Sequence, residues 1–241
     1  MFTSFKLSLP ILGVLAIAPL SMVAYGSVVI NGTRVIYQGD KKEVTVSLTN
    51  NNKTPVLIQN WLDYGKNTSA KENEAIPFIV TPPINRVDPG KGQTLRIRYT
   101  GLPALPQDRE SVLWLNVLEI PSSKKTSEGD EQQSKLNIAF RTKIKFFYRP
   151  AALTGSPVKA AAELQWHKTK NEVIAKNHSK FYISLVDISW LANGKKSEQS
   201  GTMISPGATA KFSVRNAEQV SQIRYTVIDD YGGIREFSSK L

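Results

Sequence analysis

The chain has 241 residues, 41% apolar and 21% charged, a balance typical of globular proteins that argues against a disordered chain. It contains no cysteine and only two histidines. Disulfide frameworks, thiolate metal sites and cysteine nucleophiles are therefore excluded, and a site built from several histidines is disfavoured. The formal net charge of +11 invites nucleic-acid binding, but the basic residues are dispersed and no binding motif accompanies them, so we expect no nucleic-acid partner.

The N-terminus has the pattern of a cleaved signal peptide. Lys6 precedes an almost wholly apolar run over 7–23, and small residues at the −3 and −1 positions mark a cleavage site after Gly26. The alternative is an anchoring transmembrane helix. The run is close to the minimum length of a span, contains two prolines and lacks a polar stop-transfer flank. We therefore predict a signal peptide over 1–26 and an exported product that is not membrane-embedded.

Short strand patterns fill residues 27–149. Apolar and polar residues alternate along 44–48 and 95–99, and a more continuous apolar run covers 112–120. Turn residues separate the runs, and a polar loop is expected over 122–134. Short strands that recur about every ten residues with turns between them predict an immunoglobulin-like β-sandwich.

A second unit of the same kind is expected over 150–241. Pro150 and the Gly-Ser-Pro cluster at 155–157 mark a boundary, and strand patterns resume beyond them, with a loop over 193–196. The predicted fold is thus all-β, with two immunoglobulin-like sandwiches. Tryptophans commonly fill such cores. Those expected there are Trp61, Trp114, Trp166 and Trp190.

Residues 136–148 form the longest strand pattern in the chain. Leu136, Ile138 and Phe140 fall on one face, and basic side chains alternate on the opposite face. One interpretation is an ordinary strand with one face in its own core. The other is an edge strand that adds to a foreign sheet, because a long alternating strand at the end of a domain is a good template for pairing. Periodicity alone does not separate the two.

Five sequence blocks, in order along the chain, resemble those of the periplasmic pilus (fimbrial) chaperones of the chaperone–usher pathway. They are GTRVIY at 32–37, FIVTPPINR at 78–86, DRESVLWLNV at 108–117 with IP at 120–121, KIKFFYRP at 143–150, and DDYGG at 229–233. The first unit matches better than the second. The short segment over 122–134 is similar to that of the short-loop members, which serve rod-like pili.

The resemblance implies two immunoglobulin-like domains set at an angle, forming a boomerang with a cleft. It implies a periplasmic chaperone that binds, folds and stabilises pilin subunits, lends its long strand to a subunit sandwich that lacks one, and delivers the subunit to an outer-membrane usher. Neither a cofactor nor a metal is implied, and no catalytic residue, so we expect no enzyme. The sequence leaves open whether the free protein self-associates.

The same resemblance implies roles for individual residues. Arg34 and Lys145 match the two cations that anchor the C-terminal carboxylate of the subunit, a task suited to charge-assisted hydrogen bonds. The residues that match the donor strand are Leu136, Ile138 and Phe140. Those that match an interdomain charge network, which would fix the angle between the domains, are Glu110, Arg149 and Asp230.

Two other functions compete with this interpretation. A secreted two-domain adhesin or binding module would share the fold but would not need Arg34 and Lys145. A hydrolase is third, because no Gly-x-Ser-x-Gly stretch occurs and neither histidine lies in a catalytic motif.

Overall fold

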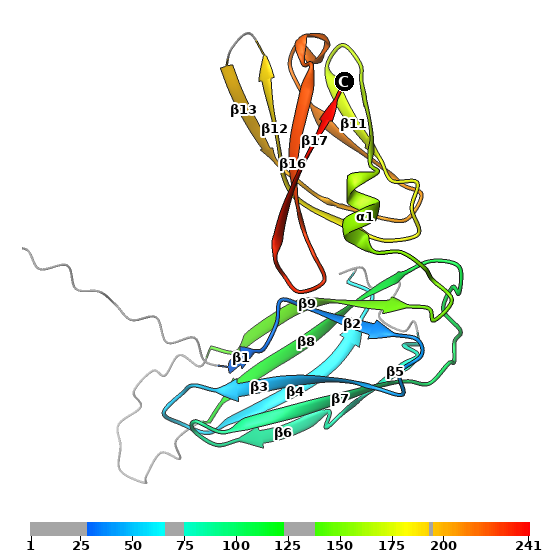
Figure 1. Cartoon of the computed structure of the whole chain (residues 1–241). Coiled ribbons are helices and arrows are strands. Elements are labelled where there is room, and N and C mark those ends of the chain that lie inside the picture. The colour runs from blue at the N-terminus through cyan, green and yellow to red at the C-terminus, as the bar shows by residue number, and fades with distance from the viewer. Residues whose placement is uncertain (1–27, 66–74, 123–137, 193–194) are drawn as a thin grey trace, which may run out of the picture.

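A computed structural model of the chain describes residues 28–65, 75–122, 138–192 and 195–241. The predicted signal peptide, Leu136 and nearly all of the predicted loop over 122–134 lie outside the described residues. The described part contains two hydrophobic cores, one drawn from residues between Val35 and Tyr148 and the other from residues between Ala160 and Val227. Two β units joined at an angle surround these cores (Figure 1).

The N-terminal unit is a sandwich of two sheets. One sheet has the strand order β1-β3-β7-β5 and the other the order β2-β9-β8-β4-β6. The strands are β1 (Val28–Ile30), β2 (Arg34–Gln38), β3 (Val44–Asn50), β4 (Val56–Asp63), β5 (Phe78–Thr81), β6 (Ile84–Val87), β7 (Gly92–Tyr99), β8 (Ser111–Pro121) and β9 (Phe140–Arg149).

Alternation in the sequence explains how these strands build a core. Val46 and Leu48 of β3 and Leu95 and Ile97 of β7 are buried, while their polar neighbours point to solvent. Burying such side chains stabilises the sandwich by about 1.5–3 kcal/mol each. We call the face of the five-stranded sheet that points away from this core the outer face.

The C-terminal unit is a second sandwich. A sheet of order β10-β11-β15 faces a sheet of order β13-β12-β16-β17, and β14 pairs with β12. The elements are α1 (Pro157–Ala162), β10 (Gln165–Lys168), β11 (Glu172–Lys176), β12 (Ile183–Ala192), β13 (Lys195–Ser200), β14 (Met203–Ile204), β15 (Thr209–Ser213), the short 3-10 helix η1 (Ala217–Gln219), β16 (Gln222–Ile228) and β17 (Ile234–Lys240).

Three local predictions differ from the structure. The cluster taken only as a boundary starts helix α1, with Ser156 as the N-cap and a proline in the first turn, a favoured start that needs no long apolar periodicity. Lys195 and Lys196, predicted in a loop, begin β13. The predicted strand over 136–148 is described from Phe140 to Arg149, and at ten residues it is one shorter than β8.

The two units meet where the β16–β17 hairpin reaches the top of the N-terminal sandwich, beside β2 and β9 (Figure 1). The end of β9 is a continuous aromatic run, Phe146-Phe147-Tyr148, because both faces of the strand are covered there. Phe146 and Tyr148 enter the N-terminal core, whereas Phe147 is on the other face and packs against Tyr182 of the C-terminal unit, with ring centroids 6.1 Å apart. Both faces of this part of the strand are therefore covered, and polar alternation disappears.

Candidate functional site

Arg34 and Lys145 lie side by side at the junction of the two units. Strand β2 runs parallel to β9, and Arg34, its first residue, pairs in register with Lys145. Both side chains extend to the C-terminal unit. The Arg34 guanidinium donates to the carbonyl of Ile228 at 3.2 Å, and the Lys145 ammonium lies 3.4 Å from the Ser184 hydroxyl oxygen.

These two cations have no salt bridge to any acidic side chain within the described part of the chain. Burial lowers the pKa of Lys145 below its ordinary value, and the nearby charge of Arg34 lowers it further. Burial also lowers the pKa of Arg34, although Asp230, Asp229 and other acids oppose the shift. The Arg34 Nε atom is buried without a hydrogen-bond partner. A carboxylate placed here would relieve the repulsion and use the free donors.

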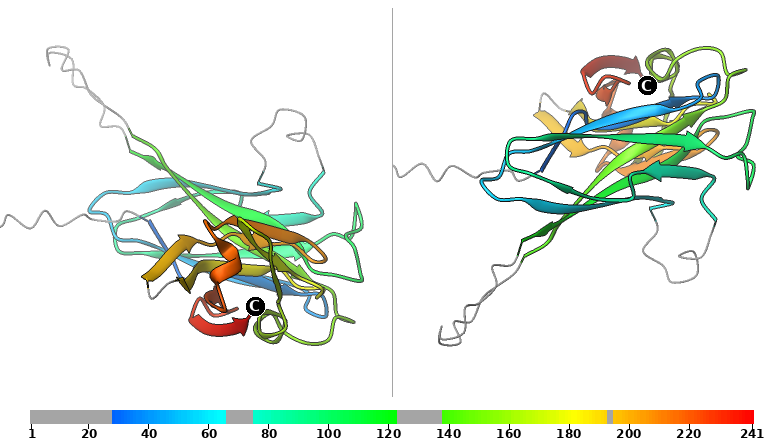
Figure 2. Two further views of the ribbon diagram at one scale, coloured as in Figure 1. Left: turned by 90° about the horizontal axis from the view of Figure 1, so that it is seen from above. Right: turned by 90° about the horizontal axis from the view of Figure 1, so that it is seen from below.

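Strand β9 has one free edge upstream of this pair. It pairs with β8 from Phe140 to Tyr148, but β2 covers its other edge only from Lys145 onward. Over 140–144 no described strand lies on that edge. Figure 2 shows the end of the β8–β9 ribbon projecting beyond the rest of the sandwich. Ile138 is 51% exposed and Phe140 59% exposed, while Leu136 is outside the described residues.

A buried charge network joins the two units. The Arg149 guanidinium donates to Glu110 at 2.8 Å and to Asp230 at 2.9 Å. Asp230 follows β16 in the C-terminal unit, so the arginine bridges both sides. Burial raises the pKa of Glu110, and Arg149 opposes that rise. Burial pulls the pKa of Arg149 down, but its hydrogen bonds to Asp230 and Glu110 hold it above the ordinary value. The structure therefore brings Glu110, Arg149 and Asp230 together.

Backbone contacts reinforce the same junction. The second Glu110 carboxylate oxygen accepts from the backbone N–H of Tyr182 at 2.8 Å, and the backbone N–H of Glu110 donates to the carbonyl of Lys180 at 2.9 Å. Gly232, at the tip of the β16–β17 hairpin, has φ of +85°, and a Cβ there would lie 2.8 Å from the Thr33 hydroxyl oxygen. A glycine is needed here for both reasons, because other residues avoid positive φ and would meet Thr33.

An acidic residue on the outer face pairs with two further cations of β9. The Asp63 carboxylate lies 3.0 Å from the Arg141 guanidinium and 3.1 Å from the Lys143 ammonium. The Asn116 amide donates to Asp63 at 2.9 Å, and the backbone N–H of Gly65 donates to it at 2.7 Å. Although burial alone would raise the pKa of Asp63, hydrogen bonds from Lys143, Gly65 and Asn116 bring it below its ordinary value. Sequence reasoning missed this residue.

Comparison with known proteins identifies the family. Residues 27–154 match the family described as pili and flagellar-assembly chaperone, PapD N-terminal domain, and residues 159–239 match the pili assembly chaperone PapD, C-terminal domain. The chain belongs to the pilus-assembly chaperones. It is 39% identical over 241 residues to the chaperone protein FimB/FhaD of Bordetella pertussis, with 98% of this chain and 97% of that protein covered.

Solved structures agree with this assignment. The crystal structure of the YadV chaperone is 37% identical with a TM-score of 0.76, and the match covers 90% of this chain and all of that one. A Salmonella enterica SafA pilin in complex with the SafB chaperone gives 28% identity and a TM-score of 0.73 over 89% of this chain and 96% of that chain. The relatives are named as chaperones, which favours a chaperone function over that of an adhesin. In the described part of the chaperone, no helix is long and apolar enough to cross a membrane.

Two tryptophans of the chaperone are not where the sequence analysis expected them. Trp61 and Trp114 lie on the outer face instead of in the core, and basic side chains stand over their rings. The Arg141 guanidinium is 5.0 Å from the Trp61 ring and the Lys143 ammonium 5.4 Å from the Trp114 ring. Trp166 is buried in the C-terminal core, and Trp190 packs at its border.

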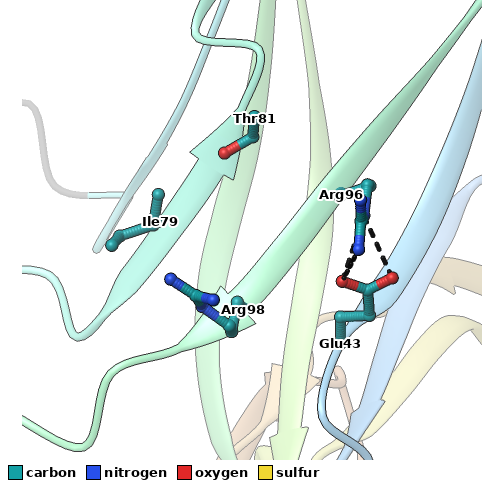
Figure 3. A pocket seen from close by; sticks show the side chains of 5 residues that line it. All are labelled: Glu43, Ile79, Thr81, Arg96 and Arg98. Carbon is teal, nitrogen blue, oxygen red and sulfur yellow. Dashed lines mark hydrogen bonds and ion pairs between the residues drawn. The ribbon is translucent and has the colours of Figure 1, made fainter.

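A separate hollow lies on the opposite sheet of the chaperone. It is lined by Glu43, Ile79, Thr81, Arg96 and Arg98 (Figure 3). Glu43 accepts from Arg96 through both oxygens, at 2.8–3.1 Å. This exposed ion pair is a useful comparison for Asp63, because it does not involve β9.

Proposed function

We propose that this chaperone binds, folds and stabilises pilin subunits by strand donation from β9, and delivers them to an outer-membrane usher. The observation that carries the proposal is the edge over 140–144, which no described strand covers and which ends at two cations without a salt bridge among the described residues. An unpaired edge recruits a foreign strand through backbone hydrogen bonds, and the side chains on one face give specificity. Leu136, Ile138 and Phe140 are the proposed donor residues.

The position of the cations supports one direction for the incoming strand. If the C-terminal carboxylate of a subunit binds Arg34 and Lys145, the residues that precede it lie along β9 toward Phe140. The subunit strand then runs from Phe140 toward Lys145, which is parallel to β9. Strand β2 already pairs parallel with β9 from Arg34 onward, so the subunit strand would occupy the line that β2 leaves empty. Fixing the carboxylate sets the register, and register decides which subunit pockets meet Ile138 and Phe140.

The remaining parts of the proposal rest on family membership and sequence. We propose a mature protein cut after Gly26 that resides in the periplasm, with an N-terminal domain over 27–149 and a C-terminal domain over 150–241. Glu110, Arg149 and Asp230 would hold these domains at a fixed angle. Self-association of the free chaperone through its exposed edge is compatible with the geometry.

The test is capture of the pilin encoded beside the chaperone gene. Arg34→Ala and Lys145→Ala should each reduce capture roughly 10- to 100-fold, because a charge-assisted hydrogen bond contributes about 1.5–3 kcal/mol. The measurement is pilin yield in the periplasm and co-purification with the variant. Arg98→Ala is the matched control, since it removes an exposed cation from the opposite sheet (Figure 3). Normal capture by both anchor variants would refute the proposal.

A further inference from the structure

Strand β9 carries several basic residues that could each bind an incoming carboxylate. Lys145, Lys143 and Arg141 are spaced two residues apart, so all three side chains lie on the outer face of the same strand. Successive members are about 7 Å apart along the strand. If strand donation is correct, a subunit that slips by two residues keeps its side chains on the correct face and brings its carboxylate to Lys143 instead of Lys145.

The structure distinguishes these cations by their partners. Asp63 pairs with both Arg141 and Lys143, at 3.0 and 3.1 Å. Arg141 also donates to the Asn116 side chain at 2.7 Å. Lys145, together with Arg34, makes no salt bridge within the described residues. Judged on the described residues, Lys145 is therefore the cation of this row that is left to bind a foreign carboxylate, with Arg34 of β2 beside it.

Asp63 is held in place beside Arg141 and Lys143. It ends β4, opposite Trp114 of β8, and receives hydrogen bonds from Asn116 and from the backbone of Gly65. Gly65 has φ of +79°, and a Cβ there would clash with the Trp114 indole nitrogen. Both the positive φ and the close approach to the indole favour glycine at this position, where its backbone N–H donates to Asp63.

We propose that Asp63 is a specificity-determining residue that pairs with the competing cations of β9, weakens their attraction for a subunit carboxylate and so restricts that carboxylate to Arg34 and Lys145. The inference rests on the proposed strand donation and adds to it the residue that selects the register. Asp63 itself does not contact the subunit carboxylate; it acts through Lys143 and Arg141. Its loss should therefore broaden which subunit termini are accepted, without abolishing capture of the natural one.

The test uses the pilin encoded beside the chaperone gene and a version of it shortened by two residues at the C-terminus. With its side chains in the natural register, the shortened subunit ends beside Lys143. We expect the wild-type chaperone to bind the shortened pilin poorly. The Asp63→Asn variant should bind it about three- to tenfold better, because the partly exposed Lys143 is then free to donate to the carboxylate. Full-length pilin should bind both proteins, which also shows that the variant folds.

Three variants complete the design. Asp63→Ser also removes the charge and should give the same gain, whereas Asp63→Asn combined with Lys143→Ala should lose it. Glu43→Gln breaks a comparable ion pair with Arg96 on the other sheet and should give no gain (Figure 3).

The outcomes separate the two proposals. No gain for the shortened pilin in either Asp63 variant, or a gain that survives Lys143→Ala, overturns the role of Asp63 while strand donation stands. Unchanged capture of full-length pilin by Arg34→Ala and Lys145→Ala overturns strand donation and the role of Asp63 with it.

Discussion

The two halves of β9 differ in how completely their edges and faces are covered. From Lys145 to Tyr148 the strand is paired on both edges, by β2 and β8, and its aromatic side chains are buried on both faces. From Phe140 to Ile144 the one described strand that pairs with it is β8, and the apolar Phe140 is exposed. One half therefore holds the protein together, and the other is left incomplete for a partner.

The cations at the two ends of the second half of β9 show a further contrast. Arg149 is almost fully buried and has two acidic partners, so its charge is already used. Lys145 is half-buried and has none among the described residues. A buried charge without a partner costs stability. The difference shows that the junction of the chaperone holds a half-buried positive charge that lowers stability. A subunit carboxylate bound there would compensate that charge.

The largest expected difference between the halves comes from removing one phenylalanine ring from each. Phe146→Ala should lower the free energy of unfolding by about 3–5 kcal/mol, because the ring is fully buried in the core. Phe140→Ala should change it by less than about 0.5 kcal/mol, because the ring is exposed. Urea denaturation measures both. Pilin capture should nevertheless be lost with Phe140→Ala, and equal destabilisation by the two variants would mean that Phe140 is a core residue.

Breaking the buried network tests the other end of the strand. Arg149→Ala should cost about 3–5 kcal/mol of stability, because it leaves Glu110 buried without its cation. It should also change the angle between the domains, which solution scattering measures. The control is Arg109→Ala, whose pair with Asp108 is exposed and screened by solvent, so its loss should hardly change stability. Scattering and thermal midpoint both unchanged in Arg149→Ala would exclude an interdomain role.

Introducing an acidic side chain beside Lys145 should give this cation an internal partner, as Arg149 already has. Ser184 lies 3.4 Å from the Lys145 ammonium, so Ser184→Asp would place a carboxylate beside it. The pKa of Lys145 should rise, and pilin affinity should fall roughly tenfold, because the subunit carboxylate now competes with an internal one. Ser184→Asn is the uncharged control of the same shape. Binding by isothermal titration distinguishes them, and equal affinities would show that Lys145 does not bind the carboxylate.

The smallest effect concerns pH. The folded protein holds the pKa of Asp63 below its ordinary value, so this residue contributes stability above the unfolded pKa of about 4 and loses that contribution as pH falls through the folded value. Wild type should therefore be more stable than Asp63→Asn at pH 7, by about 1 kcal/mol or less for a partly exposed pair. The gap should close well below pH 4. A gap that is constant from pH 7 to pH 3 would show that ionised Asp63 is not the source.

Several features of this protein could be predicted from its sequence because they depend on neighbours along the chain. Alternation between apolar and polar residues marks strands such as β3 and β7, since each strand has two faces. The family blocks predict Arg34 and Lys145 as an anchor and Glu110, Arg149 and Asp230 as a network, and the structure places the members of each set beside one another. Helix α1 escapes prediction because six residues, less than two turns, are too few to show a helical periodicity.

Other features depend on which strand lies beside which, and only the tertiary structure decided them. Trp61 and Trp114 were expected in the core because a tryptophan is apolar wherever it stands, yet their strands turn them to the outer face, where basic side chains cover them. Asp63 meets Arg141 and Lys143 from 78 and 80 residues away in the sequence. That meeting requires the register of β4 on β8 and of β8 on β9. Alternation reports the two faces of one strand, but it carries no information on the partner strand or the register, and ion pairs that act within about 4 Å depend on both.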